Sequence, residues 1–119
     1  MAENPREILN ELNAGARALY KADSERYQAW RGLTEAAFKG GVLDAKTKEL
    51  IAAALGLTST CKYCIVHHVY EALKAGATRE ELIETAFTAI GMGGGPTMTY
   101  SATLFLDAVN TFALDFEKK

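Results

Sequence analysis

The chain has 119 residues, a formal net charge of −2 and two cysteines. This length fits one domain with a modest core, and the scattered Lys and Arg residues argue against a nucleic-acid surface, which needs a concentrated basic footprint. No apolar run approaches the length of a membrane span, and the polar N-terminal stretch lacks the apolar segment of a secretory signal. We therefore expect a single soluble, cytoplasmic domain that binds neither nucleic acid nor membranes.

Helix signals recur from end to end of the chain, and strand signals are almost absent. Asn4 followed by Pro5 is typical of an N-cap and a first turn, and it predicts a helix that continues to Leu19. A second helix is expected to begin near Asp23 or Ser24 and to end at the adjacent glycines that follow it. Its aromatic residues, which we expect in the core or in a subunit contact, are Tyr27, Trp30 and Phe38.

A short connection joins the third and fourth helices. Asp44 caps the third, which we expect to end around Gly56. Ser59 or Thr60 is the expected cap of the fourth, which should start at the first cysteine and end at Gly76. Such a short connection favours antiparallel neighbours.

The rest of the chain predicts two more helices. Thr78 with Glu81 forms a capping box for the fifth, and a last helix follows the glycine-rich run before Pro96 and continues through Phe112. The sequence thus predicts an all-α fold of about six helices. In the third and fifth helices the apolar positions expected to face the core are Leu50, Ile51, Ala54, Leu55, Leu82, Ile83, Ala86, Phe87 and Ile90.

The two cysteines and one histidine share a face of the fourth helix. Cys61 and Cys64 are separated by i,i+3, and His68 follows Cys64 at i,i+4. At about 100° per residue the three side chains project within an arc of roughly 60°. A redox-active dithiol needs sulfurs close enough to bond and a base that produces the thiolate, and a helix N-terminus favours the thiolate. These three residues are the candidate redox pair and its base.

A carboxylate can be placed against this histidine by geometry. Glu49 lies about seven residues before the end of the third helix, and His68 about eight after the cap of the fourth. At ~1.5 Å per residue these are distances of roughly 10 and 12 Å from the same turn. In an antiparallel hairpin the two side chains are level, so Glu49 can orient the imidazole or pass protons to it.

The combination of Glu49, the Cys61/Cys64 pair and His68 resembles the alkylhydroperoxidase D (AhpD)-like branch of the carboxymuconolactone decarboxylase family, as does the Gly93–Pro96 run. The resemblance covers roughly residues 30–110, the expected core of one domain spanning residues 1–119. It implies an all-α fold, assembly into trimers or hexamers, and dithiol-dependent peroxidase or disulfide-reductase activity. Carried over by motif, the two cysteines are the redox pair, and Glu49 and His68 are the proton relay.

That activity implies a hydroperoxide or disulfide substrate and an external thiol or dithiol protein as the reductant. No nucleotide fingerprint is present, so we expect no bound cofactor and electrons from a thiol partner. In the characterised peroxidase a further histidine precedes the second cysteine, where this chain has Tyr63. His67 is an additional histidine that we expect at the surface or an interface. The decarboxylase branch generally lacks the cysteine pair, which disfavours lactone decarboxylation.

Two other interpretations stay open. Cys61, Cys64 and His68, with Glu49 or His67 as a fourth ligand, could bind a metal, although three ligands on one helix is a less usual geometry. The chain could also be a non-redox oligomeric protein of the same fold. Apolar faces on several helices predict a homo-oligomer under every interpretation. Within the redox hypothesis we assign peroxide attack to Cys64, the neighbour of His68, and resolution to Cys61.

Overall fold

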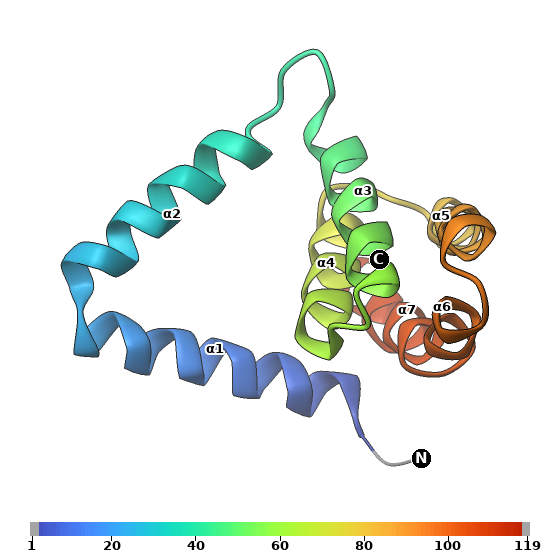
Figure 1. The fold of residues 1–119 in the computed structure, drawn as a ribbon, viewed down its shortest axis with the longest axis horizontal. Helices are drawn as coiled ribbons and strands as arrows, with labels where there is room; N and C mark the ends of the chain where they lie inside the picture. Colours follow the sequence, from blue (N-terminus) through green and yellow to red (C-terminus); the bar gives the residue numbers. More distant parts are fainter. Residues whose placement is uncertain (1–2, 118–119) are drawn as a thin grey trace.

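The computed structural model describes residues 3–117, and this range contains helices and no strand (Figure 1). The all-α fold predicted from the sequence is confirmed. None of the helices in the described range has both the length and the apolar character needed to cross a bilayer. The elements in chain order are α1 (Pro5–Ala22), α2 (Ser24–Phe38), α3 (Ala45–Thr58), α4 (Lys62–Lys74), α5 (Arg79–Gly93), α6 (Gly95–Tyr100), the π-helical segment η1 (Ser101–Phe105), α7 (Leu106–Ala113) and the 3-10 turn η2 (Leu114–Phe116).

Capping side chains begin the helices where the sequence predicts them. The side chain of Asn4 accepts hydrogen bonds from the first backbone N–H groups of α1, and that of Asp44 does the same for α3. Thr78 and Glu81 form the predicted capping box at the start of α5. The last predicted helix is present as three consecutive pieces, α6, η1 and α7.

The connection between α3 and α4 is shorter than the sequence suggests. α3 continues for two residues past Gly56, and the N-cap of α4 is Cys61, not Ser59 or Thr60. The hydroxyl of Ser59 donates to carbonyls at the end of α3, so it does not cap the next helix. Thr60 has a φ of 52°, in the left-handed region, and turns the chain into α4. The first cysteine therefore has the capping role that the sequence assigned to a hydroxyl.

The core lies between α3, α4, α5 and the C-terminal helix α7, with the first turns of α1 packed against it. Branched aliphatic and aromatic side chains fill it, which is the usual composition of a helical core. Its fully buried large side chains are Leu57, Ile65, Val66, Val69, Leu82, Phe105, Val109 and Phe112.

Three apolar side chains that the sequence assigned to the core are exposed. The exposed fractions of Ile51, Leu55 and Phe87 are 45%, 63% and 67%. Small side chains allow helices to approach closely, so the packed faces of α3 and α5 are centred on alanine and glycine, and larger residues point outward. The buried residues of these two helices are Ala52, Ala53, Gly56, Leu57, Leu82, Ala86 and Ala89.

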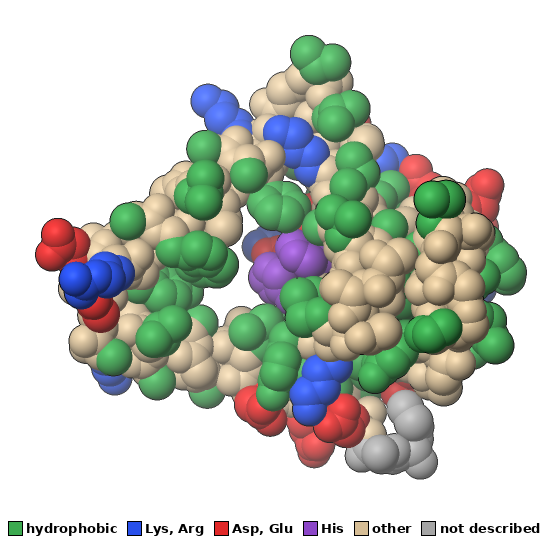
Figure 2. Space-filling view, viewed as in Figure 1, with side chains coloured by type: hydrophobic (Ala, Val, Ile, Leu, Met, Phe, Trp, Pro, Cys, Tyr) green, Lys and Arg blue, Asp and Glu red, His purple; other side chains and the backbone are tan. Residues whose placement is uncertain are grey.

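α1 and α2 form an arm that extends away from the other helices (Figure 1). α1 buries side chains only near its start, and α2 buries none completely. Figure 2 shows an opening between this arm and the main body, with histidine side chains at its edge. Trp30 on α2 is 53% exposed and lies against Tyr27, so Trp30 is not in the core of this chain.

Candidate active site

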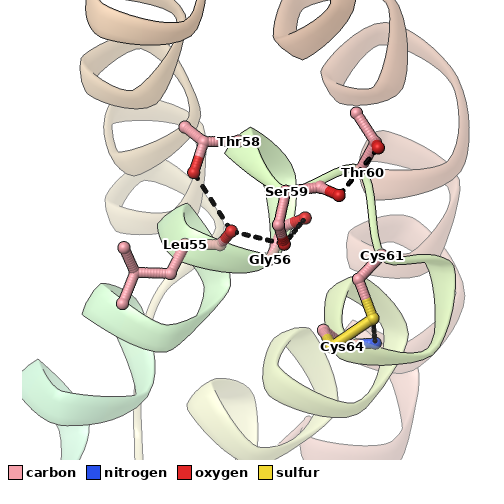
Figure 3. Close-up of a disulfide and its surroundings, with 7 residues drawn as sticks. All are labelled: Leu55, Gly56, Thr58, Ser59, Thr60, Cys61 and Cys64. Atoms are coloured by element: carbon pink, nitrogen blue, oxygen red, sulfur yellow. Dashed lines mark hydrogen bonds between the residues drawn. A yellow bond between two sulfur atoms is a disulfide. The ribbon is translucent and has the colours of Figure 1, made fainter.

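Cys61 and Cys64 form a disulfide at the N-terminal end of α4 (Figure 3). Their Cα atoms are 5.2 Å apart. Because Cys61 is the N-cap, its sulfur accepts a hydrogen bond from the backbone N–H of Cys64, with a donor–acceptor distance of 3.2 Å. The unpaired N–H groups of a helix N-terminus favour negative charge, so this position stabilises a thiolate at Cys61 once the disulfide is reduced.

His68 and Glu49 meet across the α3–α4 pair. The distance between Nδ1 of His68 and Oε1 of Glu49 is 2.8 Å, and the two side chains are 18% and 16% exposed. The antiparallel register predicted from the sequence is therefore present, with these two residues level across the hairpin. Since the carboxylate occupies Nδ1, the other ring nitrogen, Nε2, is left for a thiol or a substrate. Cys64 lies one helical turn before His68 on α4.

Phe38, the last residue of α2, lies flat on His68. The ring centroids are 5.4 Å apart and the ring planes differ by 13°, which is a stacked arrangement. The sequence did not identify Phe38 as a site residue, because the pattern of α2 does not indicate which side chains of other helices its C-terminal end contacts. An aromatic residue just before the glycines that end α2 was the only available signal.

His67 lies beside the same imidazole, in an edge-on arrangement with ring centroids 4.8 Å apart. Burial holds the pKa of His67 below its ordinary value, and the neighbouring His68 lowers this pKa further. The charges of Glu71 and Glu49 oppose this shift, and that of Arg31 adds to it. The sequence placed His67 at the surface or an interface; the structure places it half-buried next to His68.

The model of the Carboxymuconolactone decarboxylase family matches residues 25–108 of this chain. The chain belongs to the carboxymuconolactone decarboxylase family. The resemblance predicted from the sequence is thereby confirmed, and the cysteine pair is compatible with the AhpD-like branch of that family.

Relatives in bacteria share much of the sequence. An uncharacterised protein of Cupriavidus necator is 40% identical over 104 residues, which cover 86% of this chain and 92% of the relative. An uncharacterised protein from the cox locus of Paracoccus denitrificans is 34% identical over 84 residues, which cover 69% of this chain and 76% of the relative.

Solved structures of family members have the same fold. The crystal structure of a carboxymuconolactone decarboxylase family protein from Legionella pneumophila matches with a TM-score of 0.88 and 39% identity, over 92% of this chain and 96% of that chain. A Thermotoga maritima family member, described as possibly involved in antioxidative response, matches with a TM-score of 0.76 at 23% identity, over 92% and 96% of the two chains. The second match shows a shared fold.

Acidic side chains from the N-terminal part of this chain, one before α1 and one on it, contact the two residues between the cysteines. The Nζ of Lys62 lies 2.8 Å from a carboxylate oxygen of Glu3, and the hydroxyl of Tyr63 donates to the carboxylate of Glu11. The hydrogen bond to Glu11 raises the pKa of Tyr63, which keeps the phenol protonated at neutral pH. Tyr63 also lines an apolar hollow of about 750 Å³ between α1 and α2.

Within residues 3–117, no three side chains of the His, Cys, Asp or Glu type are grouped in a way that could hold a metal ion. In the disulfide, Cys61 and Cys64 offer no thiolate ligands. The arrangement of sulfur, imidazole and carboxylate is suited to thiol chemistry with proton transfer.

Proposed function

We propose that this protein is a thiol-dependent oxidoreductase that reduces hydroperoxides or disulfides. The observation that carries the proposal is the pairing of a Cys61–Cys64 disulfide with a His68–Glu49 contact one turn farther along α4. A thiolate nucleophile with a nearby base, itself oriented by a third group, is the arrangement that activates cysteine. The four residues are therefore proposed as catalytic: Cys61, Cys64, His68 and Glu49.

In the reduced protein, His68 takes the proton of the Cys64 thiol through Nε2, while Glu49 holds the imidazole at Nδ1. The Cys64 thiolate attacks the terminal oxygen of a hydroperoxide, ROOH. The O–O bond breaks, ROH leaves with the proton from His68, and Cys64 becomes a sulfenic acid. Both electrons come from the cysteine sulfur.

Cys61 then resolves the sulfenic acid. Its thiolate, stabilised at the helix N-terminus, attacks the sulfur of Cys64. The S–S bond forms as the S–O bond breaks, and the hydroxide leaves as water with the proton that Cys61 released on ionisation. An external thiol or dithiol protein reduces this disulfide through a mixed disulfide and is itself oxidised. A disulfide substrate enters the same cycle, with one of its sulfurs as the leaving group. Such a cycle needs thiol reductants, so we propose a cytoplasmic location.

Two further observations support this function and a homo-oligomeric state. The structurally similar Thermotoga maritima protein is described as possibly involved in antioxidative response. The arm leaves Leu19, Trp30 and Leu33 exposed, and apolar surface of this kind is usually buried between subunits. We propose that the chain assembles with copies of itself, as trimers or hexamers.

A thiol redox titration tests the function directly. Protein equilibrated in glutathione or dithiothreitol buffers is alkylated, and mass spectrometry separates the Cys61–Cys64 disulfide from two free thiols. We expect a reversible transition between roughly −200 and −300 mV, the range of cytosolic dithiol proteins. Turnover of tert-butyl hydroperoxide with dithiothreitol should follow, and Cys64→Ser should abolish it while Cys61 stays oxidisable. A cysteine pair that cannot be reduced, and therefore cannot be alkylated, would refute the proposal. A Cys64→Ser protein with wild-type turnover would also refute it.

A further inference from the structure

Lys48 fastens the C-terminal end of α2 to α3. Its Nζ lies 2.9 Å from the carbonyl oxygen of Ala37 and 2.6 Å from that of Lys39. The last carbonyls of a helix have no partner within the helix. An ammonium group placed there also interacts favourably with the negative end of the helix dipole. Lys48 is adjacent in sequence to Glu49, so the same turn of α3 holds both the end of α2 and the imidazole of His68.

α2 has few other attachments to the main body. α2 has no completely buried residue. In the described part of the chain, no other side-chain hydrogen bond joins α2 to α3 or α4. The one aromatic ring that α2 places against α4 is Phe38, which lies between the two carbonyls that Lys48 binds and stacks on His68. The position of the Phe38 ring therefore depends on Lys48.

We propose that Phe38 is a positioning residue of the redox site, which covers the imidazole of His68 and holds its ring plane, and that Lys48 clamps this cover in place. The ring restricts His68 to the orientation in which Nδ1 meets Glu49, because a stacked neighbour opposes rotation of the imidazole. It also shields one face of the ring from water. The effect on catalysis rests on the function proposed above, whereas the shielding of His68 does not.

Shielding is measured by the reaction of histidine with diethyl pyrocarbonate, followed residue by residue in the oxidised protein with peptide mass spectrometry. His67 is the internal reference, since it is also part-buried and directly precedes His68 on α4. The His68 side chain is 18% exposed. Removal of the ring in Phe38→Ala should raise the ratio of His68 to His67 modification about threefold, as the exposed fraction of His68 approaches roughly one half.

Lys48→Met keeps the length of the stem and removes the donor, so it should reproduce the effect of Phe38→Ala, and the double variant should add little. Lys48→Arg, which can still donate to both carbonyls, should restore the wild-type ratio. Matched controls are Phe87→Ala, at an exposed phenylalanine on α5, and Lys46→Met, at a lysine of α3 that pairs with Glu81. Neither control should change the ratio.

Turnover is the second measurement. With tert-butyl hydroperoxide and dithiothreitol, Phe38→Ala should lower kcat about tenfold and leave KM for the peroxide nearly unchanged, because orientation of the base matters in the chemical step. An unchanged ratio of His68 to His67 modification in folded Phe38→Ala would overturn the proposal that Phe38 covers His68. Phe38→Leu serves the same test should Phe38→Ala not fold. An increased ratio with unchanged kcat would overturn the positioning role, and wild-type protein without turnover would instead refute the proposed function.

Discussion

Gly56 gives α3 close access to the redox turn of α4, and its replacement by alanine is a quantitative test of this packing. A Cβ at position 56 would lie 3.1 Å from the Cβ of Cys64 and 3.3 Å from the backbone N of Ile65. The carbonyl of Gly56 also accepts a hydrogen bond from the backbone N–H of Cys61, with a donor–acceptor distance of 3.1 Å. The absence of a side chain at Gly56 lets Cys64 approach closely, and the backbone carbonyl of Gly56 binds the N–H of Cys61.

The energetic consequence follows from these distances. Carbon atoms in optimal contact are about 3.5–4.0 Å apart, so the added methyl requires a shift of roughly 0.4–0.9 Å in atoms near the helix backbone. Overpacking of this kind costs about 1–3 kcal/mol, and the better helix propensity of alanine returns about 1 kcal/mol. We expect Gly56→Ala to lose ~0–2 kcal/mol. Gly91→Ala on α5, where a Cβ would meet nothing within 4 Å, should gain up to ~1 kcal/mol.

The difference between these two variants, ~1–3 kcal/mol, corresponds to roughly 4–12 °C in Tm for a domain of this size. Thermal unfolding of the oxidised proteins, followed by circular dichroism, measures it. Reduced Gly56→Ala should also form the Cys61–Cys64 disulfide more slowly with diamide than Gly91→Ala, because the displaced atoms belong to Cys64. Equal Tm values for the two variants would show that the contact at Gly56 imposes no constraint, and the reasoning would fail.

Two further predictions concern Glu49 and His67. Glu49→Gln keeps the size of the side chain but removes the charge that orients His68, so kcat for tert-butyl hydroperoxide should fall about 10- to 100-fold; a stopped-flow rate equal to that of the wild type would contradict the relay. His67, whose pKa burial holds below its ordinary value near 6.5, binds fewer protons in the folded than in the unfolded state, so folding stability is lost as the pH falls from about 6.5 toward the folded pKa. Urea unfolding at pH 7 and pH 5 should therefore show a smaller loss of stability for His67→Gln than for the wild type, and equal losses would count against a neutral, buried His67.

The contact between Glu49 and His68 was predictable because it depends only on quantities that vary little. The rise per residue of a helix is fixed, and a short connection between two helices leaves them antiparallel neighbours. An error of two residues at each helix end, such as the continuation of α3 past Gly56, changes the expected heights only slightly. The N-caps at Asn4 and Asp44 were predictable for a similar reason, since each acts on the backbone of its own first turn.

The cover over His68 was not predictable in this way. The place of Phe38 depends on a lysine ten residues later that binds carbonyls of another helix, and no local pattern specifies such a contact. The prediction of which faces of α3 and α5 are buried was wrong in part for a related reason. An analysis of apolar periodicity assigns Ile51, Leu55 and Phe87 to the core because they are hydrophobic. The faces that pack are decided instead by where small residues let the helices approach closely.

The sulfur pair and the proposed proton relay have different structural origins. The geometry of Cys61 and Cys64 is set within a single turn of α4, by the N-cap and the i,i+3 spacing. The proposed proton transfer involves Glu49 from α3 and the ring of Phe38 from α2, both of which reach His68 only through tertiary packing. Under this proposal, substitutions on α2 and α3 disable the base while the disulfide still forms. A CxxC pair at the start of a helix is thus insufficient evidence for thiol catalysis in this fold; the carboxylate–imidazole contact across α3 and α4 is what distinguishes a proposed active site from an inert disulfide.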